Sequence, residues 1–121
     1  MTANAFRRIA LAMEGAVESA HMGHPDFRVK GRIFATLHAD NNAGMVKLSP
    51  EQQQDFVREH RSCFLPENGA WGRQGCTRVL LGSADEETVG EAMTLAWQGA
   101  VNPTTKSRTK SRAPRGRKVA R

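Results

Sequence analysis

Cysteines and long apolar runs are both scarce in this chain. Its 121 residues include two cysteines, Cys63 and Cys76. They lack the paired spacing of a zinc site, and the sequence does not decide whether a disulfide joins them. The apolar stretch IALAMEGAV near the N-terminus is interrupted by Glu14 after five residues, which is too short for a secretory signal or a membrane span. We therefore expect a soluble, cytoplasmic protein with no membrane partner.

Acidic residues are absent from the last twenty positions. Residues 102–121 carry eight cations and no acid, whereas residues 1–101 carry 10 basic and 12 acidic residues, a net charge of −2. The eight cations are Lys106, Arg108, Lys110, Arg112, Arg115, Arg117, Lys118 and Arg121. Because this segment also lacks apolar periodicity, we predict a disordered basic tail (102–121) attached to one folded domain (1–101).

Such a density of exposed cations indicates a polyanionic partner. Contacts with phosphates release condensed counterions, so the predicted binding depends strongly on salt. Phosphate contacts carry no sequence readout. The predicted partner is nucleic acid. The alternatives are a solubility tail or an RNA-sticky extension.

Recognisable catalytic groupings are also lacking. No Ser-His-Asp or Cys-His arrangement can be identified, because neither cysteine is flanked by a clear base. His21, His24 and Asp26 lie close together, but the glycine and proline between them break any helix that would align them, and a third well-spaced metal ligand is not evident. We predict a non-enzymatic protein without a metal or cofactor. Asp26 is expected in a turn, bonded to backbone N–H groups or paired with Arg28.

Periodicity and punctuation predict an α+β fold with about four to five antiparallel strands packed against helices. The expected order is a helix over 3–20, two strands within 27–37, a strand over 45–49, a helix from Pro50, an extended segment at 63–66, a strand over 76–82 and a helix ending at Asn102-Pro103. Ser49 with Gln52, and Ser83 with Glu86, have the spacing of capping boxes that begin the second and third helices.

The segment GAWGRQGCT (69–77) contains three glycines, at every third position. Its spacing matches neither phosphate-binding glycine pattern, and a strand is expected next where those patterns require a helix. We predict a hairpin or bulge in which glycine supplies positive φ and Trp71 covers the core. The alternative is a mobile wing that presents Trp71 to a base or an apolar partner, and Arg73 to phosphate.

Several segments together resemble the bacterial MmcQ/YjbR-like family. They are HPDFRVKGRIFATL, VKLSPEQQ, GAWGRQGCT and the AW of the last helix, and the resemblance covers roughly residues 5–100. It implies a CyaY-like α/β fold, an antiparallel sheet backed by helices and described as a double wing. It also implies a DNA-binding label, which favours DNA over RNA as the partner, with no enzymatic activity firmly attached. Many members read GWT where this chain has Gly75-Cys76-Thr77, a departure that removes an aromatic residue. The basic tail is not part of the family core.

Three hypotheses for function follow. In the first, the tail grips phosphates and the folded domain adds contacts through a basic strand face, Arg28, Lys30 and Arg32, together with Arg73. The second is a small-molecule or peptide pocket near His24, Asp26, Trp71 and Arg73. The third is a protein-interaction adaptor, because an acidic body with a basic tail could also bind itself.

Overall fold

The computed structural model describes residues 1–21, 23–38 and 42–102. Its elements are α1 (Ala3–Leu11), β1 (Val17–His21), β2 (His24–Val29), β3 (Arg32–Leu37), β4 (Ala43–Lys47), α2 (Pro50–Glu59), β5 (Phe64–Pro66), α3 (Gly69–Arg73), β6 (Cys76–Leu80), the 3-10 turn η1 (Leu81–Ser83) and α4 (Glu86–Val101). The predicted α+β class is confirmed, with six strands where four to five were expected. Within these ranges no helix has both the length and the apolar character that crossing a membrane requires.

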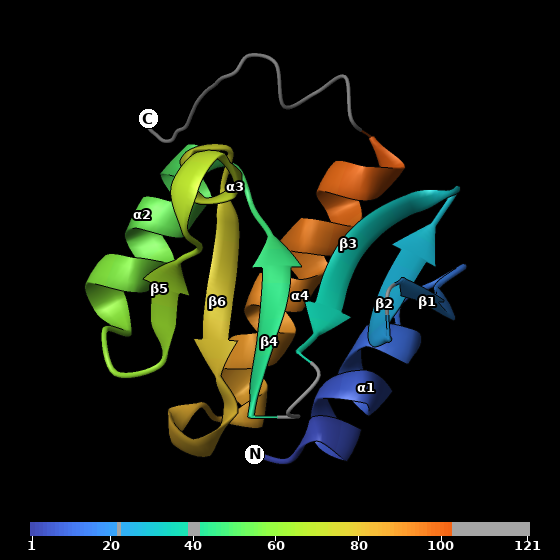
Figure 1. Ribbon diagram of the computed structural model, residues 1–121, viewed down its shortest axis with the longest axis horizontal. Helices are drawn as coiled ribbons and strands as arrows, with labels where there is room; N and C mark the ends of the chain where they lie inside the picture. The colour runs from blue at the N-terminus through green and yellow to red at the C-terminus, as the bar shows by residue number, and fades with distance from the viewer. Residues whose placement is uncertain (22, 39–41, 103–121) are drawn as a thin grey trace.

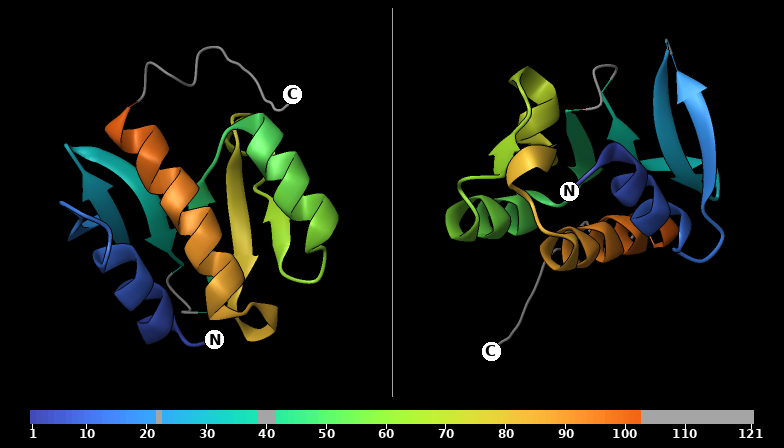
Figure 2. Two further views of the ribbon diagram at one scale, coloured as in Figure 1. Left: turned by 180° about the vertical axis from the view of Figure 1, so that it is seen from behind. Right: turned by 90° about the horizontal axis from the view of Figure 1, so that it is seen from below.

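The six strands form one antiparallel sheet in the order β1-β2-β3-β4-β6-β5. Helices α1, α2 and α4 cover one face, with α4 crossing behind the centre of the sheet (Figure 1). At the two edges of the sheet, β1–β2 and α3 rise on the opposite side (Figure 2). We call that opposite side the open face. Five of its residues are neighbours in register across five strands: Asp26, Thr36, Met45, Arg78 and Leu65.

The hydrophobic core lies between the sheet and the helices. Its largest fully buried side chains are four phenylalanines, Phe6, Phe27, Phe34 and Phe64. A register shift between β2 and β3 leaves Phe34 as an extra residue, because Phe27 pairs with Ala35 and Arg28 with Ile33. Phe34 and Ala35 are both fully buried. The bulge therefore lets two consecutive residues of β3 contribute to the core.

Local signals in the sequence are reproduced where they are strongest. Lys30 and Gly31 connect β2 to β3 with φ of 54° and 78°, the paired positive values of a type I′ hairpin turn. The predicted capping box at α2 is confirmed. The N–H of Gln52 donates to Ser49 Oγ (3.1 Å), and the N–H of Ser49 donates to Gln52 Oε1 (3.0 Å).

The predicted N-terminal helix over 3–20 is wrong in its second half. Helix α1 ends at Leu11, and Gly15 adopts φ of 76°, outside the helical region. Residues Val17–His21 instead pair with β2 as the edge strand β1. Their apolar spacing fits a helix, but pairing along β2 satisfies backbone groups of both segments. A tertiary partner therefore overrides the local pattern.

The predicted hairpin or bulge at 69–77 is also corrected. The segment forms the short helix α3 before β6, and Trp71 is 66% exposed, so it does not cover the core. Gly69 and Gly75 supply positive φ, as predicted, with values of 65° and 110°.

The last helix begins slightly later than expected. Its N-cap is Asp85, whose carboxylate accepts the N–H of Thr88 (3.0 Å), whereas Ser83 lies in η1. The hydrogen bonds from Thr88 lower the pKa of Asp85. The cap is therefore fully effective at neutral pH and is lost as the pH falls through that lowered pKa.

Candidate functional site

The predicted cations of the tail lie outside the described residues. Those cations are Lys106, Arg108, Lys110, Arg112, Arg115, Arg117, Lys118 and Arg121. Helix α4 ends at Val101, at the same end of the molecule as α3 and the β2–β3 turn (Figure 1). The attachment point of the tail is thereby fixed relative to the folded domain.

The sequence predicted a basic strand face formed by Arg28, Lys30 and Arg32, but in the structure only some of these cations are free of an ion pair. Lys30 and Arg32 are exposed at the β2–β3 turn. Arg28 is occupied, because its Nε and Nη2 donate to the two carboxylate oxygens of Asp26 (2.9 and 3.1 Å). The hydrogen bond and the charge of Asp26 raise the pKa of Arg28. The expected pairing of Asp26 with Arg28 is confirmed, and it compensates the charge of this arginine, but Asp26 lies in strand β2 and not in the expected turn.

Half of the described cations have no acid within ion-pair distance. Ion pairs engage Arg7, Arg8, Arg28, Arg58 and Arg78. The described Lys and Arg side chains without an ion pair are Lys30, Arg32, Lys47, Arg61 and Arg73. An unpaired, exposed cation keeps its full charge for a partner.

Four of these unpaired cations come from one end of the sheet. Lys30 lies in the β2–β3 turn, and Arg32 begins β3. Lys47 ends β4 opposite Cys76, and Arg73 ends α3 just before β6. We call these four residues the basic end. Glu51 also lies at this end, in the first turn of α2, where the helix dipole favours its charge.

Helix α3 is fixed to its surroundings by buried contacts. The amide of Gln53 on α2 donates to the carbonyl oxygens of Gly72 (3.0 Å) and Cys76 (2.9 Å). A Cβ at Gly72 would lie 1.8 Å from the carbonyl oxygen of Glu67, so the helix packs against backbone too closely for any side chain. Trp71 and Arg73 are therefore displayed from an anchored helix, where the alternative drawn from the sequence expected a mobile wing.

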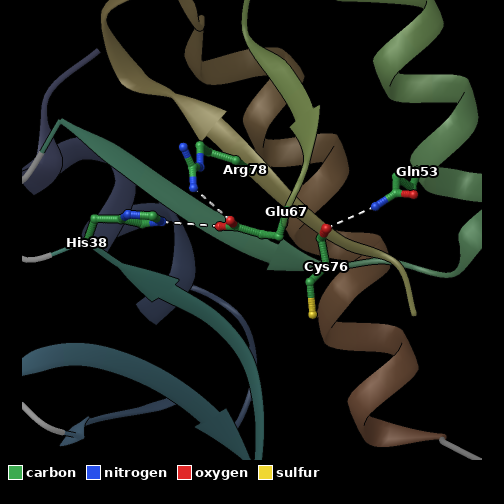
Figure 3. A network of polar contacts seen from close by, with 5 residues as sticks. All are labelled: His38, Gln53, Glu67, Cys76 and Arg78. Atoms are coloured by element: carbon green, nitrogen blue, oxygen red, sulfur yellow. Dashed lines mark hydrogen bonds and ion pairs between the residues drawn. The ribbon is translucent and has the colours of Figure 1, made fainter. Parts of the chain in front are cut away.

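A polar network spans the open face (Figure 3). Glu67 contacts His38 Nε2 (3.2 Å) through one oxygen and accepts Nη2 of Arg78 (3.0 Å) through the other. Glu67 follows β5 and His38 follows β3, with β6 and β4 between them. Three strand spacings of a flat sheet amount to about 14 Å, so these side chains meet only because the open face is concave.

The charges within this network compensate one another, so the network adds no free positive charge to the basic end. Glu67 is 14% exposed and shared between two basic side chains. Arg78 Nε is buried and has no hydrogen-bond partner within the described chain. Sequence reasoning missed His38, Glu67 and Lys47, because no local pattern marks residues that only strand pairing brings together.

The residues of the predicted pocket are not assembled. His24 begins β2 and is exposed, and Asp26 is buried beside Arg28. Trp71 projects from α3, which packs against β6, and both β3 and β4 separate β2 from β6. Figure 1 and Figure 2 both place α3 and β2 at opposite edges of the sheet. Within the described ranges, no three His, Cys, Asp or Glu side chains are grouped to hold a metal ion.

The two cysteines are free and buried, so no disulfide joins them. Burial raises the pKa of both thiols, which keeps them protonated and poorly nucleophilic at neutral pH. We expect a thiol-reactive reagent to modify Cys63 and Cys76 far more slowly in the native protein than in urea, with the native rate rising as the pH increases. Titration with an aromatic disulfide reagent tests this, and rapid native labelling would contradict it.

The fold and these contacts define a small α+β domain with an open sheet face and a basic end, and comparisons place that domain among known proteins. The family model of YjbR matches residues 11–99. This chain belongs to the YjbR family. The crystal structure of the Deinococcus radiodurans protein DR2400, which has a DUF419 domain, is similar at 20% identity and a TM-score of 0.68. The match covers 90% of this chain and 83% of that protein. No curated protein matches the chain. The predicted resemblance is confirmed, and the structural likeness supports the fold alone.

Proposed function

We propose that this chain is a non-enzymatic nucleic-acid-binding protein of the cytoplasm that contacts phosphates, with DNA as the preferred partner. The basic tail supplies most of the contacts, and the basic end continues them onto the folded domain. The free thiols of Cys63 and Cys76 agree with a reducing compartment.

One observation carries the proposal: the unpaired cations are segregated. Arg61 follows α2 at the opposite end of the sheet, whereas Lys30, Arg32, Lys47 and Arg73 gather at the end where α4 leads into the tail (Figure 1). A concentration of unpaired cations at one end of the domain attracts a polyanion and steers its association. Arg28 and Arg78 are excluded from this surface, because carboxylates occupy them.

Replacing the four cations of the basic end by glutamine tests the contribution of the folded domain. We expect weaker binding to a labelled duplex, and a log–log salt slope reduced by up to about 3.6, since each phosphate contact contributes about 0.9. Fluorescence anisotropy over a salt series measures both quantities.

Arg61→Gln provides the matched control, because Arg61 is exposed and unpaired but lies at the other end. It should leave the slope almost unchanged. Equal effects of Arg61→Gln and of a single substitution in the basic end would reject a localised interface. An unchanged slope in the fourfold variant would remove the folded domain from the proposal.

A further inference from the structure

Trp71 is the most exposed large hydrophobic side chain in the described chain. It is 66% exposed, compared with 58% for Val17, 39% for Leu11 and 36% for Leu65. Leaving an indole in water forgoes the free energy of its burial. Tryptophan is also among the residues most enriched at binding hot spots. Its position on the surface needs an explanation that packing within this domain does not supply.

The backbone that carries Trp71 is held from both sides. Gly72 follows Trp71, and its carbonyl oxygen accepts a hydrogen bond from the side-chain amide of Gln53. Gly72 also packs directly on the backbone of Glu67. Gly75 accepts the N–H of Leu48 (3.1 Å), which ties the end of this segment to the β4–α2 connection. A partner that binds Trp71 therefore meets a pre-ordered platform, and little backbone entropy is lost on binding.

The unpaired cations of α3 and of the neighbouring strand end select the kind of partner. Arg73 lies two residues after Trp71 in α3. Lys47 pairs in register with Cys76, the first residue of β6, which follows α3 in the chain. Both cations are unpaired, so an apolar protein surface placed here would have to desolvate them without compensation. A chain of phosphates that also carries aromatic rings satisfies the cations and the indole together. Nucleic acid has both components, and base–aromatic stacking tolerates any base.

We propose that Trp71 is a stacking site for an unpaired base, so that the interface prefers single-stranded over duplex nucleic acid. The bases of a duplex are already stacked on one another, and their faces are not available to an indole. Single strands expose those faces to aromatic platforms that lie beside a cationic track. This inference rests on the proposed nucleic-acid binding and adds the strand state of the ligand.

The test uses the full chain with a fluorescein-labelled oligothymidylate and a duplex of the same length. Trp71→Ala should weaken binding to the single strand by roughly 5- to 150-fold, the effect of losing one stacked base. Binding to the duplex and the salt slope should stay unchanged, because no phosphate contact is removed. Trp71→Phe keeps a ring and should retain most of the affinity. Val17→Ala removes another exposed apolar side chain and should have no effect.

Intrinsic fluorescence gives a second readout that a purely structural role would not move. The chain has two tryptophans, and Nε1 of Trp97 donates to the carbonyl of Glu14 (2.8 Å) on the helix side of the molecule. Oligothymidylate should quench the wild-type emission by stacking on Trp71. In Trp71→Phe, where Trp97 is the remaining fluorophore, that quenching should disappear.

The outcomes separate this inference from the function on which it rests. If wild-type protein binds neither probe, the proposed function fails and the stacking site fails with it. If both probes bind and Trp71→Ala leaves the single-strand affinity unchanged, the stacking site is overturned while nucleic-acid binding stands. An equal loss of affinity for both probes would also overturn it, because a base stacked on Trp71 must be unpaired.

Discussion

Neutralising the basic tail is expected to weaken duplex binding by about a thousandfold or more at low salt and to flatten its salt dependence. The change replaces every cation of the tail by glutamine, at Lys106, Arg108, Lys110, Arg112, Arg115, Arg117, Lys118 and Arg121. Eight phosphate contacts at about 0.9 each would contribute about 7 to the log–log slope. The remaining slope should match the few contacts of the basic end. Anisotropy over a salt series measures affinity and slope in one experiment.

A permuted tail separates charge from sequence. Keeping the composition of residues 102–121 but changing its order should preserve both affinity and slope, because phosphate contacts carry no base readout. A truncation after residue 101 should behave like the glutamine variant. If the neutralised tail binds as tightly as the natural one, the tail is not a binding element, and the basic end must account for any binding alone.

Predictions from the sequence succeeded where the deciding interactions are local. The capping box of Ser49 and Gln52 joins residues three apart, and both of its hydrogen bonds are present. The two strands expected within 27–37 are also present, and the turn of Lys30 and Gly31 that joins them depends on adjacent residues. The family resemblance then supplied the packing of these elements into a sheet, which local rules alone do not determine.

The errors occurred where contacts between neighbouring segments overrule the preference of each segment alone. Residues after Gly15 have helical apolar spacing, yet β1 forms because β2 lies beside it along its whole length. Helix α3 was missed because its glycines suggested a turn. Gly72 is required there by contact with the carbonyl of Glu67, five residues earlier, and not by positive φ. That requirement cannot be recognised until the path of the chain is known.

The candidate site shows the same division. The sequence identified Lys30, Arg32 and Arg73 as exposed cations. It could not show which cations have an ion-pair partner or which of them lie together. The structure selects pairing with Arg28 from the two roles expected for Asp26, and it alone shows that Lys47 joins the others at one end of the sheet. The concavity of the open face depends on strand order and curvature, so the contact between His38 and Glu67 leaves no trace in either local segment.

Gly75→Ala is expected to destabilise the domain by about 4 kcal/mol or more, a large share of the roughly 5–15 kcal/mol typical of a folded domain. Gly75 adopts φ of 110°, where a Cβ is strained, and that Cβ would lie 1.9 Å from the carbonyl oxygen of Leu48. The neighbour is backbone at the entry to α2, which cannot move without breaking the hydrogen bond from the N–H of Leu48 to Gly75. Strain and steric overlap therefore act together.

The same substitution at Gly90 should have the opposite sign. Gly90 lies inside α4, its φ is not positive, and an added Cβ would meet nothing within 4 Å. Alanine there should stabilise the domain by about 0.5–1 kcal/mol, because it lowers the conformational entropy of the unfolded chain. Urea unfolding followed by circular dichroism measures both variants. If Gly75→Ala and the wild type have similar urea unfolding midpoints, the contact between Gly75 and Leu48 is not important for stability. It then does not hold α3 and β6 against the start of α2. The fixed platform inferred for Trp71 would then lose one of its two supports.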